Sequence, residues 1–318
     1  MQPDDDVDIT VIVVNYNTAY LLDRMFSALA AAQGDLRIQT VVVDNASSDH
    51  SVALLRTKYP DVELVENPIN VGFGRANNQA VARIRGRFVL LLKTDAFISP
   101  DTLLKTVGFM KENPRCGVLG VKLVAEDGSL QPCCRYFPTP WNVFLGTTGL
   151  GRFFPHTRLV DDMSWDHASI RKCDWVPGCY YLIRREVVER VGLFDPQYFL
   201  YCEEADHCRR VVQAGWDVIY YPHTQVIHIG GESAKSNGPL SDGRQQISAL
   251  QIESELLYFR KHHGLTGLFS SVFLMMLTDA YVALKPRRSK GRAADAVKHE
   301  RTVMRLLIET RLASRPTV

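Results

Sequence analysis

The N-terminal third of the chain alternates short apolar runs with segments of helical periodicity. Four apolar, β-branched runs have the length and composition of buried strands, at residues 9–14, 38–44, 62–67 and 87–96. Apolar residues recur at helical spacing between these runs, at residues 20–32, 48–60 and 71–84. This alternation predicts an α/β fold in which helices cover both faces of a mostly parallel central sheet.

Polar side chains stand where three of these predicted strands end. Asn15 and Asn17 follow the first strand, Asp44 ends the second, and Thr94 and Asp95 close the fourth. Ligands of open α/β sheets bind beyond the carboxyl ends of the strands. The convergence of amides and carboxylates at these ends therefore predicts a nucleotide-sized pocket.

The second half of the chain has a different character. Residues 132–155 are rich in Pro, Gly and aromatic residues, which predicts a long irregular connection that acts as a lid or docking loop. Two strand patterns then flank a helix that carries the stretch FLYCEEADHCRR (199–210). Its three clustered carboxylates repel one another, so we expect them to meet a positive charge or a proton.

Seven segments in a fixed order resemble the family-2, inverting glycosyltransferases with the nucleotide-sugar-binding A-type (GT-A) fold, especially their bacterial rhamnosyltransferase-like branch. The segments are VIVVNYN, VVVDNASSD, NPINVGFGRANN, LLLKTDAFISP, VPGCYYLIRREVVERVGLFDPQYFLYCEEADHCRR, GWDVIYYPHTQVIHIGG and LLYFRKHHG. The resemblance covers most of residues 9–264. It implies a Rossmann-like GT-A domain over residues 1–264, with a donor half to about residue 130 and an acceptor half from 131, then a helical extension over 265–318.

Transfer from a nucleotide sugar requires two acidic sites. Departure of the diphosphate develops negative charge that a divalent cation or positive side chains must offset. The acceptor hydroxyl must also lose a proton as it attacks, which calls for a carboxylate base on the opposite side of the sugar.

The family holds its cation with an Asp-x-Asp-type motif, and KTD (93–95) is the matching stretch. Asp95 matches the carboxylate that coordinates the metal. Lys93 departs from the usual Asp or Asn: either the position tolerates the change, or the ammonium offsets diphosphate charge and weakens metal dependence. His228, in VIHIGG, matches the histidine that completes the site. The resemblance thus implies Mn²⁺ or Mg²⁺ as cofactor, which suits imidazole, carboxylate and phosphate ligands.

The acidic cluster matches the family's Glu-Asp-x-Asp signature at the start of a helix, where the helix dipole offsets some of the repulsion. Glu204 falls at the general-base position, which is normally Asp, and Glu203 matches the preceding acid that lines the acceptor site. Asp206 is expected to be a solvated helix acid that pairs with Arg209 or Arg210.

The resemblance also implies contacts with donor and acceptor. Trp175 and Gly178, in WVPGC, match the strand on the acceptor side, where an indole stacks on a sugar or belongs to the core. Asp44 matches the residue that binds the pyrimidine edge. For residues 72–78, the alternative to a contact with the donor is a simple helix-opening turn. The implied donor-binding set is Asn15, Asn17, Asp44, Gly72, Arg75, Asn78, Lys93, Thr94 and Asp95.

Charge and cysteine content narrow the class of protein. A formal net charge of +2 over 318 residues gives no reason to expect nucleic acid as a partner. The seven cysteines are odd in number and lack zinc-ribbon spacing, which predicts reduced thiols in a cytoplasmic protein. The acidic start MQPDDDVD lacks the features of a secretory signal.

The C-terminal region combines an apolar helix with a basic cluster. Residues 268–284 contain a single acid, Asp279, and fall short of the ~20 residues that span a bilayer. Five Lys or Arg residues follow within 285–292. Two interpretations stay open: a peripheral anchor on the anionic inner face of the cell membrane, or a helix that packs on the catalytic domain or on a second subunit in a homodimer.

The resemblance therefore implies an inverting glycosyltransferase of cell-surface polysaccharide synthesis. Its donor would be a dTDP- or UDP-sugar, with rhamnose the leading sugar, and its acceptor a glycan or lipid-linked glycan. The alternative is a non-catalytic relative that binds nucleotide sugars or glycans, which the departures at Lys93 and Glu204 keep open. A nucleotidyltransferase is disfavoured, because NYNTAY stands where a phosphate-binding loop would follow the first strand.

Overall fold

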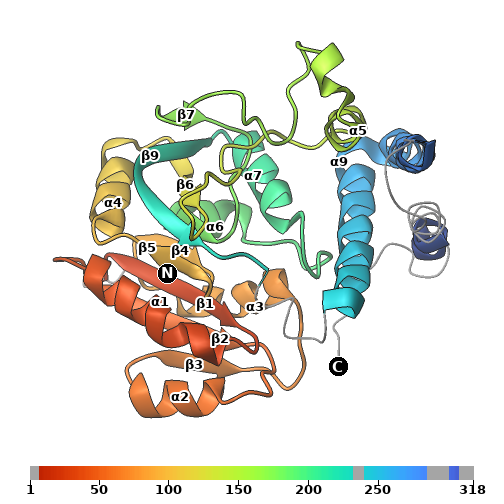
Figure 1. Ribbon diagram of the computed structural model, residues 1–318. Helices are drawn as coiled ribbons and strands as arrows, with labels where there is room; N and C mark the ends of the chain where they lie inside the picture. Colours follow the sequence, from red (N-terminus) through yellow and green to blue (C-terminus); the bar gives the residue numbers. More distant parts are fainter. Residues whose placement is uncertain (1–6, 232–239, 285–300, 308–318) are drawn as a thin grey trace.

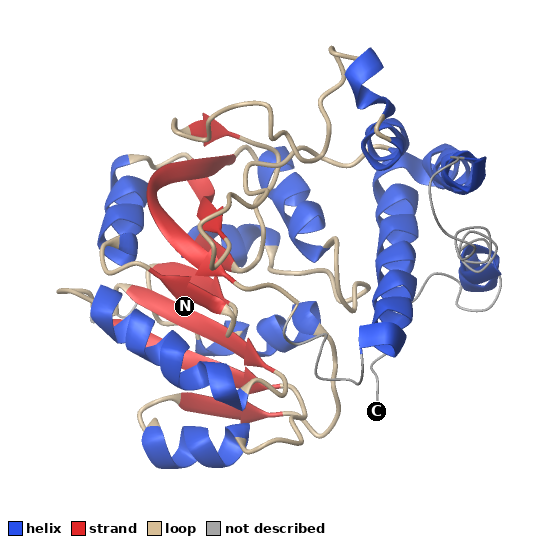
Figure 2. Cartoon of the chain, viewed as in Figure 1, coloured by secondary structure: helices blue, strands red, loops and turns tan. Residues whose placement is uncertain are grey.

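A single curved sheet runs through the computed structural model, which describes residues 7–231, 240–284 and 301–307, with only the backbone over 240–248 and 282–284. Its strand order is β3-β2-β1-β4-β8-β6-β9-β5, with β7 paired to β9 (Figure 1). Helices lie on both sides of this sheet (Figure 2). The predicted α/β class is therefore confirmed.

The N-terminal half contains the parallel part of the sheet. Its four parallel strands are β1 (Ile9–Asn15), β2 (Ile38–Asp44), β3 (Glu63–Glu66) and β4 (Phe88–Leu92). The helices between them are α1 (Ala19–Ala32), α2 (Ser51–Lys58) and α3 (Phe73–Gln79), which the short helix η1 (Val81–Arg83) follows. The register of β1 on β2 pairs Asn15 with Asp44, so the polar strand ends meet at one edge as expected.

The second half makes the sheet mixed. β8 (Tyr180–Arg184) lies antiparallel between β4 and β6 (Cys116–Val124). The long strand β9 (Asp217–His228) runs parallel to β6 and then pairs antiparallel with β5 (Ala96–Ile98), so His228 lies opposite Ala96. The remaining elements here are α4 (Thr102–Glu112), β7 (Arg171–Lys172), α6 (Arg185–Val191) and α7 (Glu203–Gln213).

Two segments differ from their sequence-based prediction. The predicted strand 87–96 ends at Leu92, and residues 93–95 form a turn into the separate strand β5. The predicted irregular connection contains the helix α5 (Pro140–Thr148) and the short helix η2 (Leu150–Phe153). A capping box begins α5, because Thr139 accepts from the Asn142 backbone and the Asn142 side chain accepts from the Thr139 backbone.

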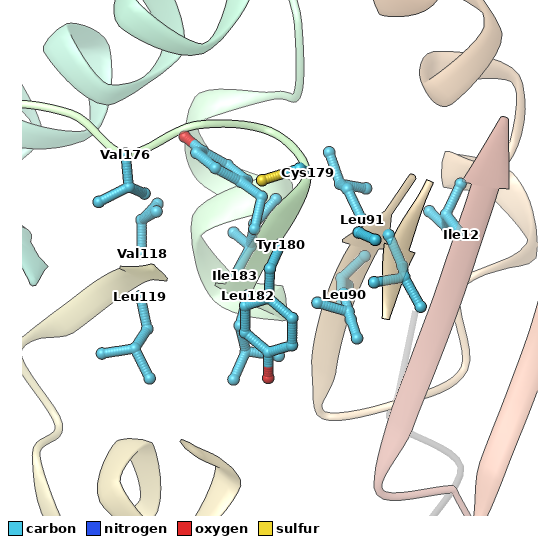
Figure 3. Close-up of a cluster of buried hydrophobic side chains, with 14 of the residues drawn as sticks. Ile12, Leu90, Leu91, Val118, Leu119, Val176, Cys179, Tyr180, Leu182 and Ile183 are labelled. Atoms are coloured by element: carbon cyan, nitrogen blue, oxygen red, sulfur yellow. The ribbon is translucent and has the colours of Figure 1, made fainter. Parts of the chain in front are cut away.

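The core is centred on β8 and its two neighbours. Leu182 and Ile183 lie between Leu90 of β4 and Val118 of β6 (Figure 3). All these side chains are fully buried, and each such residue contributes about 1.5–3 kcal/mol through burial. The strands therefore form a rigid platform for the polar residues at their ends.

The C-terminal helix α9 (Leu240–Leu284) stands at the edge of the molecule beside α5 (Figure 1). Gly264, with φ 66° and ψ −163°, breaks it into two parts at the predicted domain boundary. Within the described residues, 249–281 is the one helical stretch long and apolar enough to cross a membrane. The predicted basic cluster at 285–292 lies outside the described residues.

Candidate active site

A cavity of about 280 Å³ lies at the sheet edge where β4 ends and β8 begins. Five of the residues that the sequence singled out line it: Lys93, Trp175, Gly178, Glu204 and His228. They come from the turn after β4, the segment before β8, the first turn of α7 and the end of β9. The fold thus brings together residues up to 135 positions apart in the chain.

Glu204 is held by the segment that precedes β8. The backbone N–H of Gly178 donates to Glu204 Oε1 at 3.0 Å. A Cβ atom on residue 178 would lie 2.5 Å from the same oxygen, so the missing side chain of Gly178 makes room for the carboxylate. Glu204 is half-buried and faces the cavity, as a proton acceptor for a bound molecule must.

The two residues before the acidic cluster have an uncommon backbone conformation. Tyr201 and Cys202 both have positive φ, at 73° and 63°, which costs a residue with a side chain about 1–2 kcal/mol. Both line the cavity, and Cys202 is the residue at the N-cap position of α7. The strained turn therefore directs the first turn of α7, and Glu204 with it, toward the cavity.

Glu203 occupies a different environment from the one predicted. It is 1% exposed and is absent from the cavity lining, and its Oε2 has no hydrogen-bond partner among the described residues. Burial raises the pKa of Glu203 well above its usual range, and the charge of Glu204 adds to the effect. The protonated form of Glu203 is therefore favoured, and the expectation that it lines the acceptor site is corrected.

His228 and Asp95 meet where β9 pairs with β5. His228 Nε2 lies 3.7 Å from Asp95 Oδ1, too far for a hydrogen bond, and this buried nitrogen has no partner among the described residues. Asp95 is 5% exposed. One cation can bind two groups at such a separation, so the pair fits a divalent ion with oxygen and nitrogen ligands.

Gln131 fixes the orientation of the His228 ring. Its side-chain N–H donates to the His228 carbonyl at 2.7 Å, which turns its Oε1 toward His228 Nδ1 at 2.9 Å. Because an amide oxygen only accepts, Nδ1 carries the proton and Nε2 presents a lone pair toward Asp95. Burial lowers the pKa of His228, with Asp95 opposing and Lys93 adding to the shift, which favours the neutral ring that binds metals.

Lys93 places a positive charge in the cavity. Burial alone would lower its pKa, but the carboxylates of Glu204 and Asp95 outweigh burial and raise it, so the ammonium form is favoured. Its Nζ also lies 5.2 Å from the centre of the Phe73 ring. Lys93 thus places a cation near the carboxylates of Glu204 and Asp95, rather than a charge on the protein surface.

The acidic ligands are sparse in this region. Within the described ranges, no group of three or more His, Cys, Asp or Glu side chains could hold a metal ion. Asp95 and His228 are therefore a partial ligand set, which phosphate oxygens and water would complete.

The polar residues at the ends of β1 and β2 satisfy one another. Asn15 is fully buried and donates to Asp44 Oδ1 at 2.8 Å, while Asp44 Oδ2 accepts from the Ser47 backbone. Asn17 Oδ1 accepts from the Ser48 backbone at 2.7 Å. These side chains hold the strand ends and the loop 45–50 in place. Thr94 joins the same network: the proton of the Thr18 hydroxyl goes to Asn15 Oδ1, and the Thr94 hydroxyl, 2.9 Å away, donates to that of Thr18.

The predicted donor contacts near α3 have partners inside the protein. A Cβ atom on Gly72 would lie 2.4 Å from the Phe199 carbonyl, so its close approach is to the chain itself. Both ends of the Asn78 amide bond to the Phe194 backbone, at 2.7 and 3.0 Å. Arg75 donates to the Val71 carbonyl at 3.1 Å. These contacts join α3 to the segment before α7, which gives Gly72 and Asn78 a structural position.

Trp175 and Arg135 form one wall of the cavity. The Arg135 guanidinium lies 4.0 Å from the centre of the Trp175 ring, and Trp175 Nε1 donates to the Tyr136 carbonyl at 2.8 Å. Arg135 also pairs with Asp161. Sequence reasoning missed Arg135 and Gln131, because neither belongs to a recognisable motif and both act through residues distant in the chain.

Asp206 is fully buried, which corrects the expectation of a solvated acid. It pairs with Arg210 at 2.9 Å, as predicted, and accepts from His262 of α9 at 2.7 Å. Burial would raise its pKa, but hydrogen bonds from His262 and Lys261 outweigh that effect and lower it. Asp206 thus fastens α7 to α9.

All seven cysteines, each within the described residues, are free thiols as predicted.

Known glycosyltransferases resemble this chain in sequence. Residues 10–145 match the model of Glycosyl transferase family 2. The chain is 27% identical over 267 residues to an N-acetylglucosaminyl-diphospho-decaprenol L-rhamnosyltransferase of Mycobacterium tuberculosis, which covers 80% of this chain and 85% of the relative. It is 26% identical over 238 residues to Rhamnosyltransferase WbbL of Escherichia coli, covering 71% and 85%.

Solved structures share the fold. The mannosyltransferase PcManGT of Pyrobaculum calidifontis, in complex with GDP-Man and Mn²⁺, has a TM-score of 0.57 at 18% identity, over 97% of this chain and 91% of that one. GalNAc-T7 with UDP, GalNAc and Mn²⁺ has a TM-score of 0.55 at 12% identity, over 97% and 57%. These structures are GT-A glycosyltransferases.

Proposed function

We propose that this chain, whose residues 10–145 match the model of Glycosyl transferase family 2, is a GT-A glycosyltransferase that transfers rhamnose, with inversion, from a dTDP- or UDP-sugar to a lipid-linked glycan. The observation that carries this proposal is the shared cavity of Glu204, Lys93 and His228. The Glu204 carboxylate can accept a proton there. The Lys93 ammonium and the His228 ring, whose Nε2 has no partner among the described residues, line the same cavity.

Glu204 acts as the general base. It accepts the proton of the acceptor hydroxyl while the oxygen bonds to the anomeric carbon, and the bonding pair to the diphosphate leaves with the diphosphate oxygen. A single displacement of this kind inverts the sugar carbon. Gly178 positions the carboxylate through the hydrogen bond to Oε1.

Asp95 and His228 would hold a divalent cation, Mn²⁺ or Mg²⁺, which when bound supplies charge stabilisation for the leaving diphosphate. The unpartnered Nε2 and the tautomer set by Gln131 support this assignment. Lys93 adds a second positive charge in the same cavity. We infer that the ammonium shares the diphosphate charge with the cation rather than replacing it, since the Asp95–His228 pair is retained.

The name of the Mycobacterium relative supports the proposal of a lipid-linked acceptor. It agrees with the exposed apolar face on the second part of α9, where Leu265, Phe269 and Phe273 are 60–65% exposed. Together with the basic residues at 285–292, this face suits peripheral attachment to the cytoplasmic side of an anionic membrane. Vesicle co-sedimentation tests this: protein that stays in the supernatant, or a homodimer that covers α9, would contradict it.

The proposed reaction is tested with dTDP-rhamnose, N-acetylglucosaminyl-diphospho-polyprenol and Mn²⁺, with the product linkage read by NMR. We expect a rhamnosyl product whose anomeric configuration is opposite to that of the donor. A retained configuration would contradict the role of Glu204. Donor binding without consumption, for every donor and acceptor supplied, would favour the non-catalytic alternative.

A further inference from the structure

A second cavity, of about 300 Å³, lies between α5 and the two parts of α9. α5 contributes Val143 and Phe144, the first part of α9 contributes Ile252 and Phe259, and the second part contributes Leu274 and Met275. This apolar groove has no role in the chemistry described above, and its walls come from three helical segments of the acceptor side.

Three of the six polar residues that line the groove have hydroxyls turned back on their own helices, and the other three are Gln251, Glu255 and Asp279. The hydroxyls of Thr147, Ser271 and Thr278 donate to the carbonyls of Val143, Leu268 and Leu274, at 2.9, 2.7 and 2.9 Å. Their donors are therefore satisfied. The apolar side chains of the groove offer little to a sugar, which needs hydrogen-bonding groups, and suit an apolar chain.

The groove adjoins the active-site cavity. Val143, Gln251 and Glu255 belong to the lining of both. At this junction Gln251 donates to Glu255 at 3.1 Å. A molecule whose sugar lies near Glu204 can therefore extend an attached chain past this polar pair into the groove.

The second part of α9 has two apolar faces. Leu265, Phe269 and Phe273 repeat every four residues on the exposed face. Leu274 and Met275 point instead into the groove. One helix thus separates the surface proposed to lie on the membrane from a groove that leads toward the reacting centre.

We propose that this groove binds the apolar chain of the lipid-linked acceptor and leads it from the membrane surface to the active site. The proposal rests on the proposed function, and adds to it the site for the lipid part of the acceptor. Each methylene group buried in such a groove strengthens binding roughly fourfold. Acceptor affinity is therefore set by chain length as well as by the sugar.

Two adjacent methionines give a matched test. Met275 lines the groove, whereas Met276 is 42% exposed on the outside of the same helix. We compare Met275→Trp with Met276→Trp, using acceptors that share one sugar-diphosphate head and carry either a short citronellyl chain or a long polyprenyl chain. A Trp at position 275 fills the groove, while the same residue at 276 points away from it.

We expect Met275→Trp to raise KM at least tenfold for the long-chain acceptor, to leave KM for the short-chain acceptor unchanged, and to leave donor affinity unchanged. Met276→Trp should alter none of these. Equal KM changes with both acceptors, or no change with either, would overturn the proposal.

Binding of a sugar-free polyprenyl diphosphate separates this proposal from the proposed function. If wild-type protein binds this lipid and Met275→Trp weakens binding while Met276→Trp does not, the groove assignment holds even where no rhamnosyl transfer is found. Undiminished lipid binding by Met275→Trp would overturn the assignment even where transfer occurs.

Discussion

The two halves of this protein differ in whether their buried polar side chains all have hydrogen-bond partners. In the donor half, Asn15, Thr18 and Asp44 bond to one another or to neighbouring backbone at the ends of β1 and β2. Across the described residues, buried side-chain nitrogen and oxygen atoms without a partner occur only in the second half: in Trp165, His167, Tyr198, Glu203, His228 and Glu253. One of them, His228 Nε2, faces the Asp95 carboxylate of the KTD turn.

This difference distinguishes residues that hold the fold in place from residues that are available to bind a ligand. An unpartnered buried polar atom is costly, at about 1–3 kcal/mol, so a folded protein retains it only where something else offsets the penalty. In the donor half, the hydrogen bonds among Asn15, Thr18 and Asp44 satisfy these polar groups and hold the strand ends in place. At His228 the acceptor half leaves a nitrogen open, and a bound cation is the partner that the neighbouring carboxylate favours.

The largest expected contrast comes from His228→Ala and Asn15→Ala. Loss of His228 removes a cation ligand, so the dissociation constant for Mn²⁺ should rise by more than the ~10–100-fold typical of outer-shell changes. Asn15→Ala should leave Mn²⁺ affinity unchanged but lower the free energy of unfolding by about 3 kcal/mol, because Asp44, Ser47 and Thr18 each lose a buried partner. Isothermal titration and denaturant unfolding measure the two quantities.

The opposite result for His228→Ala would contradict this distinction between metal-binding and structural residues. If His228→Ala mainly destabilised the fold and left Mn²⁺ binding intact, the open nitrogen would be a packing feature rather than part of a site.

The next effect concerns the position of Glu204. Gly178→Ala places a Cβ 2.5 Å from Glu204 Oε1, so the carboxylate must move. A displacement of about 1 Å in a catalytic group can lower kcat about 100-fold. We expect that loss with donor affinity unchanged. Gly108→Ala is the control, because a Cβ there meets nothing within 4 Å and α4 gains a better helix former. Wild-type kcat in Gly178→Ala would contradict the positioning role.

A smaller effect is expected at Gln131. Gln131→Leu removes the acceptor that fixes the His228 tautomer, so Mn²⁺ affinity should fall by roughly 10–100-fold. ¹⁵N NMR of the metal-free protein reports the tautomer directly: wild type should show a protonated Nδ1, and Gln131→Leu a mixture of both forms. Gln131→Glu retains an acceptor at Nδ1 and should restore the tautomer. An unchanged NMR spectrum in Gln131→Leu would show that Gln131 has no such role.

Local patterns were sufficient to predict the elements of the donor half. The apolar runs and helical spacing located β1, β2 and β4 because these strands are buried on both faces. Motif matches also placed Glu204 and His228 in one cavity. What these patterns share is that the signal lies within a few neighbouring residues.

Features that depend on distant contacts were not predicted. β5 is three residues long and exists because β9 pairs with it, and α5 begins at a capping box inside a segment whose composition suggested a loop. The burial of Glu203 and Asp206 likewise depends on how α7 packs against the segments around it. A helix-start acid cluster cannot reveal which carboxylate faces a cavity and which is enclosed.

The most direct test of the central claim compares Glu204→Gln with Glu203→Gln under single-turnover conditions, with donor affinity measured on the same samples. Both changes preserve shape, but only Glu204 lines the cavity, and burial raises the pKa of Glu203, which favours its neutral form. We expect Glu204→Gln to slow transfer by roughly 10²–10⁴-fold with unchanged donor affinity, since it removes the base, and Glu203→Gln to have little effect. A Glu204→Gln variant that transfers at the wild-type rate would contradict the assignment.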